Sequence, residues 1–206
     1  MLNDLKQAIS RAEAGLTYLP QPVVEMEGMS SPKVRRLLNG LVNDDSRYLE
    51  VGVWKGSTFI SALTNHKPQF SCAIDDFSEF EGTEEAFREN CRRHLGYEPN
   101  LINADFSGVD ITSHGLRDID VYFYDGCHSN QCQTLALTHF LPALAREFIF
   151  VVDDWNWEGV RIGTLHGVDL AGLTVVEEYT LPARFNGDTE QCWNGIWVAR
   201  LQKGAT

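Results

Sequence analysis

Short, nearly uniform apolar runs alternate with stretches of helical periodicity through the middle of the chain. The runs are typical of strands buried on both faces, and they lie at Tyr48–Val53, Phe70–Ile74, Asn100–Ala104, Ile119–Tyr124 and Phe148–Val152. Helical stretches lie between them at Ser57–Asn65, Thr83–Leu95 and Asn130–Leu144. This alternation predicts right-handed crossovers, and therefore a Rossmann-like, doubly wound α/β fold with a mostly parallel sheet.

The two ends of the chain show different patterns. Apolar residues recur at helical spacing within residues 2–12, and a second helix begins at Ser31 and Pro32, which suit the cap and the first helical position. Toward the C-terminus, Leu173–Thr180 and Gly195–Leu201 look like strands with no helical pattern between them. We therefore expect N-terminal helices and a seven-stranded sheet that ends in an antiparallel C-terminal edge pair.

No repeat or flexible linker divides the chain, so the sequence predicts one domain over residues 1–206. Within it we expect an N-terminal helical segment at 1–45 and a Rossmann-like core at 46–206.

Charge narrows the classes of partner. The chain has 17 Lys and Arg against 29 Asp and Glu, a net charge of −12. A nucleic-acid-binding protein needs a basic face to release counterions from phosphate, and anionic lipid attracts basic surfaces, so we expect neither partner. No apolar run approaches the roughly 20 residues that span a membrane. Five cysteines without paired spacing favour a reduced, cytoplasmic setting.

Acidic residues gather where the predicted strands end. In a doubly wound sheet, ligands bind at the carboxyl ends of the strands. The residues at these positions are Glu50, Asp75, Asp76, Asp105, Asp125, Asp153 and Asp154.

The first of these ends opens a glycine-rich turn, EVGVWKGS, at residues 50–57. Gly52 permits a tight turn with no side chain toward a ligand, and Gly56 permits close approach at the helix start, which Ser57 can cap. The spacing differs from the dinucleotide fingerprint, because the third glycine is missing, and from a phosphate loop. A plain strand-to-helix turn would look the same.

The next two strand ends carry carboxylates that suit a nucleoside. Asp75, followed by Asp76, can accept hydrogen bonds from the two hydroxyls of a ribose. Asp105 can accept from an adenine amine while Phe106 packs on a ring. Solvated acidic turns are the alternative for both places.

These motifs together resemble the class I S-adenosylmethionine (SAM)-dependent methyltransferases. The resemblance runs from about Val24 to the C-terminus and rests on EVGVWKGS (50–57), AIDDF (73–77), NADF (103–106), IDVYFYDGCHS (119–129) and FIFVVDDWN (148–156). It is closest to the small metal-dependent O-methyltransferases of the catechol, caffeoyl-CoA and macrolide-sugar types. The SAM-binding candidates are Glu50, Gly52, Trp54, Gly56, Ser57, Asp75, Asp76, Asp105, Phe106 and Asp125.

The ends of the fourth and fifth strands predict a metal site. Neighbouring parallel strands lie about 4.8 Å apart, so Asp125 can converge with Asp153 and Asp154. These oxygen donors suit Mg²⁺, or another hard divalent cation, better than zinc. Adjacent Asp153 and Asp154 can both reach one ion only if the strand breaks there, and Asn156 could replace either. The alternative is an acidic rim without metal.

The candidate catalytic residues are Asp125 and His128, which lies three residues beyond it and is the candidate base. Its ordinary pKa suits proton uptake near neutral pH. The catechol-type enzymes carry a lysine at the corresponding position, so this chain departs from that pattern. His128 could instead fix the loop that orients Asp125.

The resemblance thus implies metal-dependent O-methylation of a small hydroxylated molecule. The alternatives are a noncatalytic SAM-binding sensor module and an NAD-linked oxidoreductase on the same fold. A homo-oligomer is compatible with the sequence. Residues expected to flank the acceptor are Tyr18, Met26, Met29, Trp155, Trp157, Phe185 and Trp193.

Overall fold

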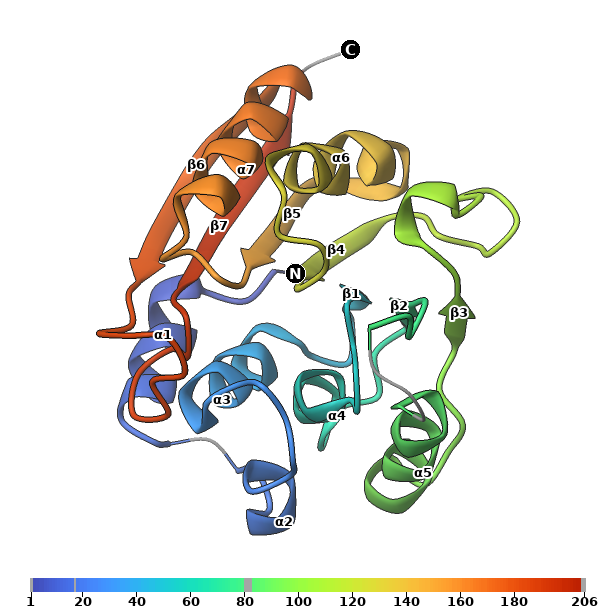
Figure 1. Cartoon of the computed structure of the whole chain (residues 1–206), viewed down its shortest axis with the longest axis vertical. Coiled ribbons are helices and arrows are strands. Elements are labelled where there is room, and N and C mark those ends of the chain that lie inside the picture. Colours follow the sequence, from blue (N-terminus) through green and yellow to red (C-terminus); the bar gives the residue numbers. More distant parts are fainter. Residues whose placement is uncertain (1, 17, 80–82, 205–206) are drawn as a thin grey trace.

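A computed structural model describes residues 2–16, 18–79 and 83–204. Within these ranges seven strands form one sheet, in the order β3-β2-β1-β4-β5-β7-β6 (Figure 1). The strands are β1 Arg47–Val51, β2 Phe70–Asp75, β3 Leu101–Asn103, β4 Ile119–Tyr124, β5 Leu144–Val152, β6 Leu173–Leu181 and β7 Ile196–Lys203. The first five are parallel, and β7 pairs antiparallel with both β5 and β6. The predicted fold class is confirmed.

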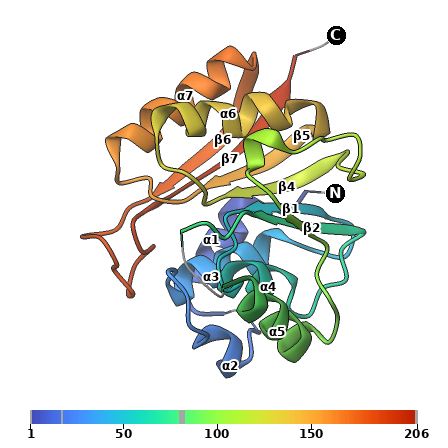
Figure 2. The same cartoon turned by 45° about the vertical axis from the view of Figure 1, so that its right-hand side comes forward.

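Helices cover both faces of the sheet. Figure 2 shows α6 and α7 on one side and α1 to α5 on the other. Their bounds are α1 Leu5–Glu13, α2 Gln21–Val24, α3 Pro32–Leu41, α4 Ser57–Leu63, α5 Thr83–Leu95, α6 Asn130–Phe140 and α7 Glu158–Leu170, with short 3₁₀ turns η1 Phe106–Gly108 and η2 Leu141–Ala143. Within the described ranges, no helix has the length and apolar character needed to cross a membrane.

The two faces of the sheet bury separate apolar clusters because successive side chains of a strand point to opposite sides. Tyr48 and Phe123 pack with α1, α3 and α4, whereas Leu49 and Tyr122 pack with α6. All four side chains are fully buried. This two-sided burial explains why the strands read as continuous apolar runs.

Helix α7 is the main element that the sequence pattern missed. Its three glycines, at positions 159, 163 and 167, oppose a helix prediction because glycine is a poor helix former. In the structure they allow α7 to lie directly against α6: a Cβ at Gly163 would be 2.7 Å from the Cβ of Gln133. Close helix packing therefore outweighs intrinsic propensity here.

Candidate active site

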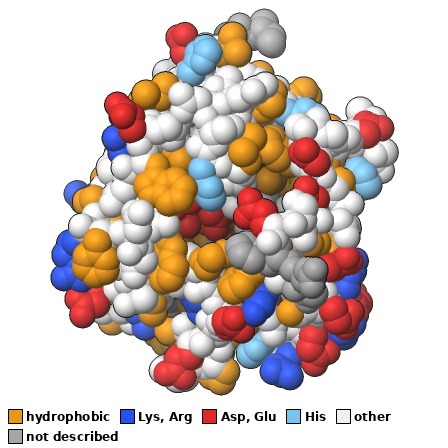
Figure 3. Space-filling view, viewed as in Figure 1, with side chains coloured by type: hydrophobic (Ala, Val, Ile, Leu, Met, Phe, Trp, Pro, Cys, Tyr) orange, Lys and Arg blue, Asp and Glu red, His pale blue; other side chains and the backbone are white. Residues whose placement is uncertain are grey.

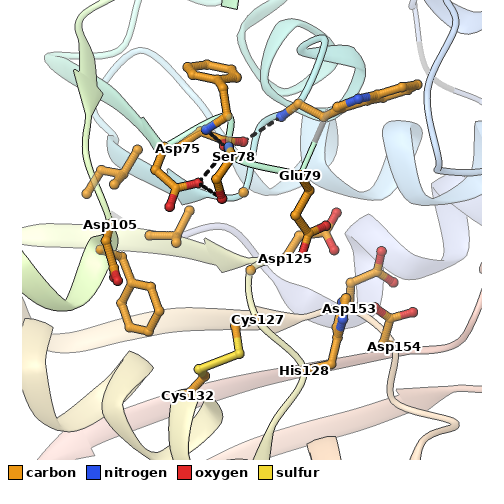
Figure 4. A pocket seen from close by; sticks show the side chains of 18 of the residues that line it. Asp75, Ser78, Glu79, Asp105, Asp125, Cys127, His128, Cys132, Asp153 and Asp154 are labelled. Carbon is orange, nitrogen blue, oxygen red and sulfur yellow. Dashed lines mark hydrogen bonds and ion pairs between the residues drawn. A yellow bond between two sulfur atoms is a disulfide. The ribbon is translucent and has the colours of Figure 1, made fainter. Parts of the chain in front are cut away.

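A cavity of about 580 Å³ opens at the carboxyl ends of β1, β2, β4 and β5. The strand order reverses between β1 and β4, and such a switch point is where doubly wound sheets bind ligands. Acidic side chains gather in the hollow at the centre of this face, beside a histidine and among hydrophobic side chains (Figure 3). Figure 4 shows the side chains that line it.

Gly52 begins the turn at one end of the pocket. Its φ of 84° favours glycine, and a Cβ here would overlap the main-chain carbonyl of Asp125 and lie 2.9 Å from the nitrogen of Gly126. The requirement for glycine therefore comes from the close approach of two strand ends as well as from the turn. Gly52 and Trp54, two of the predicted SAM-binding residues, both line the pocket.

Asp75 fixes the shape of this turn. Its Oδ2 accepts hydrogen bonds from the main-chain nitrogens of Val53 and Trp54, both at 2.8 Å, and its Oδ1 accepts from Phe77 at 2.8 Å. A carboxylate has about four lone-pair sites, so one acceptor position remains for a ligand. Asp75 lines the pocket and can hold both the turn and a ribose hydroxyl.

The other candidates near the nucleoside end also line the pocket. Asp76 and Asp105 accept hydrogen bonds within their own loops, from Ser78 and Ser107 respectively. Phe106 packs edge-on against Tyr124, with ring centroids 5.5 Å apart. Asp76, Asp105 and Phe106 therefore line the same pocket as Asp75, and their contacts with a nucleoside stay predictions.

Three predicted cofactor residues lie outside the pocket lining. Glu50 is fully buried, where its carboxylate accepts hydrogen bonds from Thr58 at 2.6 Å and from Tyr48. Burial raises the pKa of Glu50 to about 8. Gly56 has φ 87° and lies against the ring of Phe87. A Cβ at this position would be 2.7 Å from Cδ2 of Phe87. Both residues therefore contact protein groups next to the turn, and their predicted roles in SAM binding stay predictions.

Ser57 is the third predicted cofactor residue outside the pocket lining. Its hydroxyl lies 3.2 Å from that of Ser30, on the segment that precedes α3, and its side chain is buried. No side-chain cap hydrogen bond forms at the start of α4. The small Ser57 side chain therefore lets the N-terminal segment pack over the turn.

The strand break required for a metal site occurs at Asp154. β5 ends at Val152, and Asp154 has φ 57°, in the left-handed region that aspartate tolerates better than most residues. Asp153 and Asp154 therefore both line the pocket, opposite Asp125. Burial and the neighbouring carboxylates raise the pKa values of Asp125 and Asp153.

His128 joins this acidic end. Its Nε2 lies 2.5 Å from Asp154 Oδ2, and this hydrogen bond raises the pKa of His128, to which the charges of Asp154 and Glu79 contribute less. Ligand atoms of Asp125, His128 and Asp154 all lie within 4.8 Å of one another, and the predicted ligand Asp153 lies outside this group. The Oδ1 of Asp153 is buried and has no hydrogen-bond partner among the described residues.

Residues after β5 anchor the 182–195 loop. Asn156 donates to the carbonyl of Ala183 at 2.8 Å and does not line the pocket, so its predicted metal role is not supported by its position. Asn194 donates to Asp154 Oδ1 at 2.5 Å. Sequence patterns missed Asn194 because only the folded loop brings it to β5.

The predicted aromatic and methionine residues divide into two groups. Met29, Trp157 and Trp193 line the pocket, and Trp157 packs edge-on against His128 with ring centroids 4.8 Å apart. The residues that do not line it are Tyr18, Met26, Trp155 and Phe185. Trp155 instead stacks on Trp197 inside the core.

Cys127 and Cys132 form a disulfide that flanks His128, with Cα atoms 5.7 Å apart. This differs from the expectation of unpaired cysteines, because the turn into α6 brings the two residues together. The described free cysteines are Cys72, Cys91 and Cys192, all buried.

We therefore expect three titratable thiols in the denatured protein without reductant and five after reduction. Cys132→Ser should raise the unreduced count to four and lower the free energy of unfolding by about 2 kcal/mol, the chain-entropy value for so short a loop. Ellman titration and urea denaturation measure these quantities. Five thiols before reduction would contradict the pairing.

Comparison with known proteins assigns the family. The sequence profile of the methyltransferase domain matches residues 49–155, just over half of the chain. The chain belongs to the methyltransferase-domain family. The predicted class, a class I SAM-dependent methyltransferase, is confirmed at this level, and the O-methyltransferase subtype stays a prediction. No curated protein sequence matches this methyltransferase significantly.

Solved structures share the fold at low identity. TrmN from Thermus thermophilus has a TM-score of 0.64 and 14% identity over 89% of this chain and 52% of its own. Precorrin-6y C5,15-methyltransferase from Geobacter metallireducens has a TM-score of 0.63 and 16% identity over 84% and 88%. Sp1610 from Streptococcus pneumoniae, assigned as a tRNA (m1A22) methyltransferase and solved with SAM, gives 0.57 and 16% over 84% and 73%. The methyltransferase spans about half the length of the Thermus protein.

Proposed function

We propose that this methyltransferase transfers the methyl group of SAM to a hydroxyl oxygen of a small acceptor, with the help of a divalent cation. The observation that carries the proposal is the meeting of two sets of residues in one cavity. The turn held by Asp75 lies at one end, and Asp125, Asp154 and His128 lie at the other.

The cofactor would lie across the ends of β1 to β3. Gly52 leaves room at the turn, Asp75 offers its remaining acceptor position to a ribose hydroxyl, and Asp105 with Phe106 borders the adenine. Glu50, Gly56 and Ser57 keep the turn in shape from beneath. SAM supplies an electrophilic methyl group when it is bound.

The acidic end fits a divalent cation by its chemistry. Asp125, Asp153 and Asp154 offer the oxygen donors that Mg²⁺ prefers, and Asp153 Oδ1 is buried without a described partner. Without a cation, repulsion among these neighbouring carboxylates destabilises their charged forms, in addition to the effect of burial. The pKa values of Asp125 and Asp153 are raised for both reasons. A cation held by these residues would lower the pKa of an acceptor hydroxyl.

His128 would take the proton of that hydroxyl. Its Nε2–H donates to Asp154, which orients the ring and leaves Nδ1 to accept a proton. With SAM bound, the acceptor oxygen would form a bond to the methyl carbon as the carbon–sulfur bond breaks, and S-adenosylhomocysteine (SAH) would leave. Holding the two reactants in line contributes to the rate through orientation.

A nucleic-acid acceptor is the second candidate, because Sp1610 is assigned to tRNA methylation. The net charge of −12 and the acidic pocket oppose it, since phosphate contacts need Lys and Arg. Assays with radiolabelled SAM separate the candidates: catechols and sugars in one set, with Mg²⁺ or EDTA, and bulk tRNA in the other. Transfer to tRNA alone would overturn the proposal, and binding of SAM without any transfer would favour a sensor module.

Asp75→Ala tests the cofactor end. We expect SAM binding to weaken by about 1–3 kcal/mol, the scale of hydrogen bonds to a charged group. Calorimetry measures the dissociation constant, and Asp169→Asn, on the exposed surface of α7, is the matched control. A dissociation constant unchanged by Asp75→Ala would remove Asp75 from the ribose site.

We also infer that the segment 1–45 and the core 46–206 form a single methyltransferase domain. Leu5 and Val34 from the N-terminal helices share one apolar cluster with Val121 and Ile149 of the sheet.

A further inference from the structure

The pocket is lined by acidic side chains and by no lysine or arginine among the described residues. Its seven carboxylates belong to Asp75, Asp76, Glu79, Asp105, Asp125, Asp153 and Asp154. Lys55, beside the glycine turn, lies outside the lining and pairs with Glu27 at 2.6 Å. An anionic acceptor would therefore find no fixed positive side chain here.

Six of these carboxylates either accept hydrogen bonds within the pocket loops or belong to the proposed cation site. Asp75, Asp76 and Asp105 accept hydrogen bonds within the loops of the cofactor end. The other three, Asp125 with the pair after β5, form the proposed cation site. Glu79 is exposed and makes no hydrogen bond or ion pair with any other described residue.

Glu79 is nevertheless aimed at the reactive end. Figure 4 shows its side chain extending from the loop after β2 toward Asp125, and its charge contributes to the raised pKa of His128. The Oδ1 of Asp153, already assigned to the proposed cation site, lines the same pocket. Trp157 and Trp193 add aromatic surfaces that attract cations.

Resting on the proposed function, we propose that the methyl acceptor carries a positively charged amine near its hydroxyl group, and that Glu79 selects for this charge. The hydroxyl would face His128, and the amine would lie between Glu79 and the aromatic side chains. The proposal names a substrate class, hydroxylated amines, and a specificity-determining residue.

Three catechols of similar size test the proposal: dopamine, neutral 4-ethylcatechol and anionic 3,4-dihydroxyphenylacetate. Calorimetry measures their binding to the full chain with SAH and Mg²⁺. One added charge pair at an exposed site should make dopamine bind about fivefold tighter than 4-ethylcatechol, and the acid should bind more weakly than both. Glu79→Gln should remove most of this preference, whereas Glu13→Gln, an exposed change on α1, should preserve it.

Equal or tighter binding of the acid, no binding of dopamine, or an unchanged preference in Glu79→Gln would overturn the inference. Methyl transfer to the same three compounds is measured separately. Transfer without a preference for dopamine would refute the charge selection alone. A charge preference in binding without any transfer would support the selection and refute O-methylation.

Discussion

Asp154→Asn is expected to lower methyl transfer by about a hundredfold or more while SAM binding stays unchanged. The substitution keeps the size of the side chain, and asparagine tolerates the left-handed backbone at φ 57°. It removes one charged donor from the proposed cation site and weakens the hydrogen bond that orients His128. Both losses act at the acceptor end, away from Asp75.

The same variant should lose its thermal response to Mg²⁺. A ligand present at a hundred times its dissociation constant stabilises the folded state by about 2.7 kcal/mol, so Mg²⁺ should raise the melting temperature of the parent protein. Asp169→Asn should respond as the parent does. If EDTA leaves both activity and melting temperature of the parent unchanged, the cation is refuted and His128 alone remains as the candidate base.

Gly52→Ala is expected to lower the free energy of unfolding by about 3 kcal/mol or more, and to abolish SAM binding in any protein that still folds. The added Cβ would overlap the carbonyl of Asp125 at a φ of 84°, so β1 and β4 must separate at their carboxyl ends. Because this overlap is with main chain, no rotation of a side chain relieves it.

Urea denaturation measures the loss of stability, and calorimetry measures SAM binding. Gly172→Ala is the matched control, because its φ of 62° carries similar backbone strain while a Cβ there meets no atom within 4 Å. The difference between the two variants isolates the close approach of the strand ends. Equal destabilisation by both would show that backbone strain alone requires glycine at position 52.

The positions of the buried strands and most helices could be predicted from the sequence. Continuous apolar runs such as Phe148–Val152 are typical of strands covered on both faces, so local composition already contains the information about layers. Ser31 and Pro32 likewise mark the start of α3, where Ser31 accepts a hydrogen bond from Val34 at 3.2 Å. Helix α7 was not predicted, because its glycines disfavour a helix in the sequence and are explained only by the close packing of α7 against α6.

The acidic strand ends were equally visible, since strand direction alone places them at one edge of the sheet. The sequence did not show which neighbour each carboxylate contacts. The sequence did not distinguish the pocket-facing Asp75 from Glu50, which turns away to bond Thr58. Position along the strands decides this difference, because Glu50 is paired with Ala73, two residues before Asp75, and so lies farther from the carboxyl ends of the strands.

The sequence by itself determined the fold class, the methyltransferase resemblance and the strand ends that carry the chemistry, because these depend on local composition and strand direction. Only the tertiary structure decided which side chains meet: His128 with Asp154, Asn194 with the same carboxylate, and Glu79 extending toward the same end of the pocket. These contacts join loops far apart in the chain, and their side chains meet only after packing of the sheet and helices fixes where each loop begins.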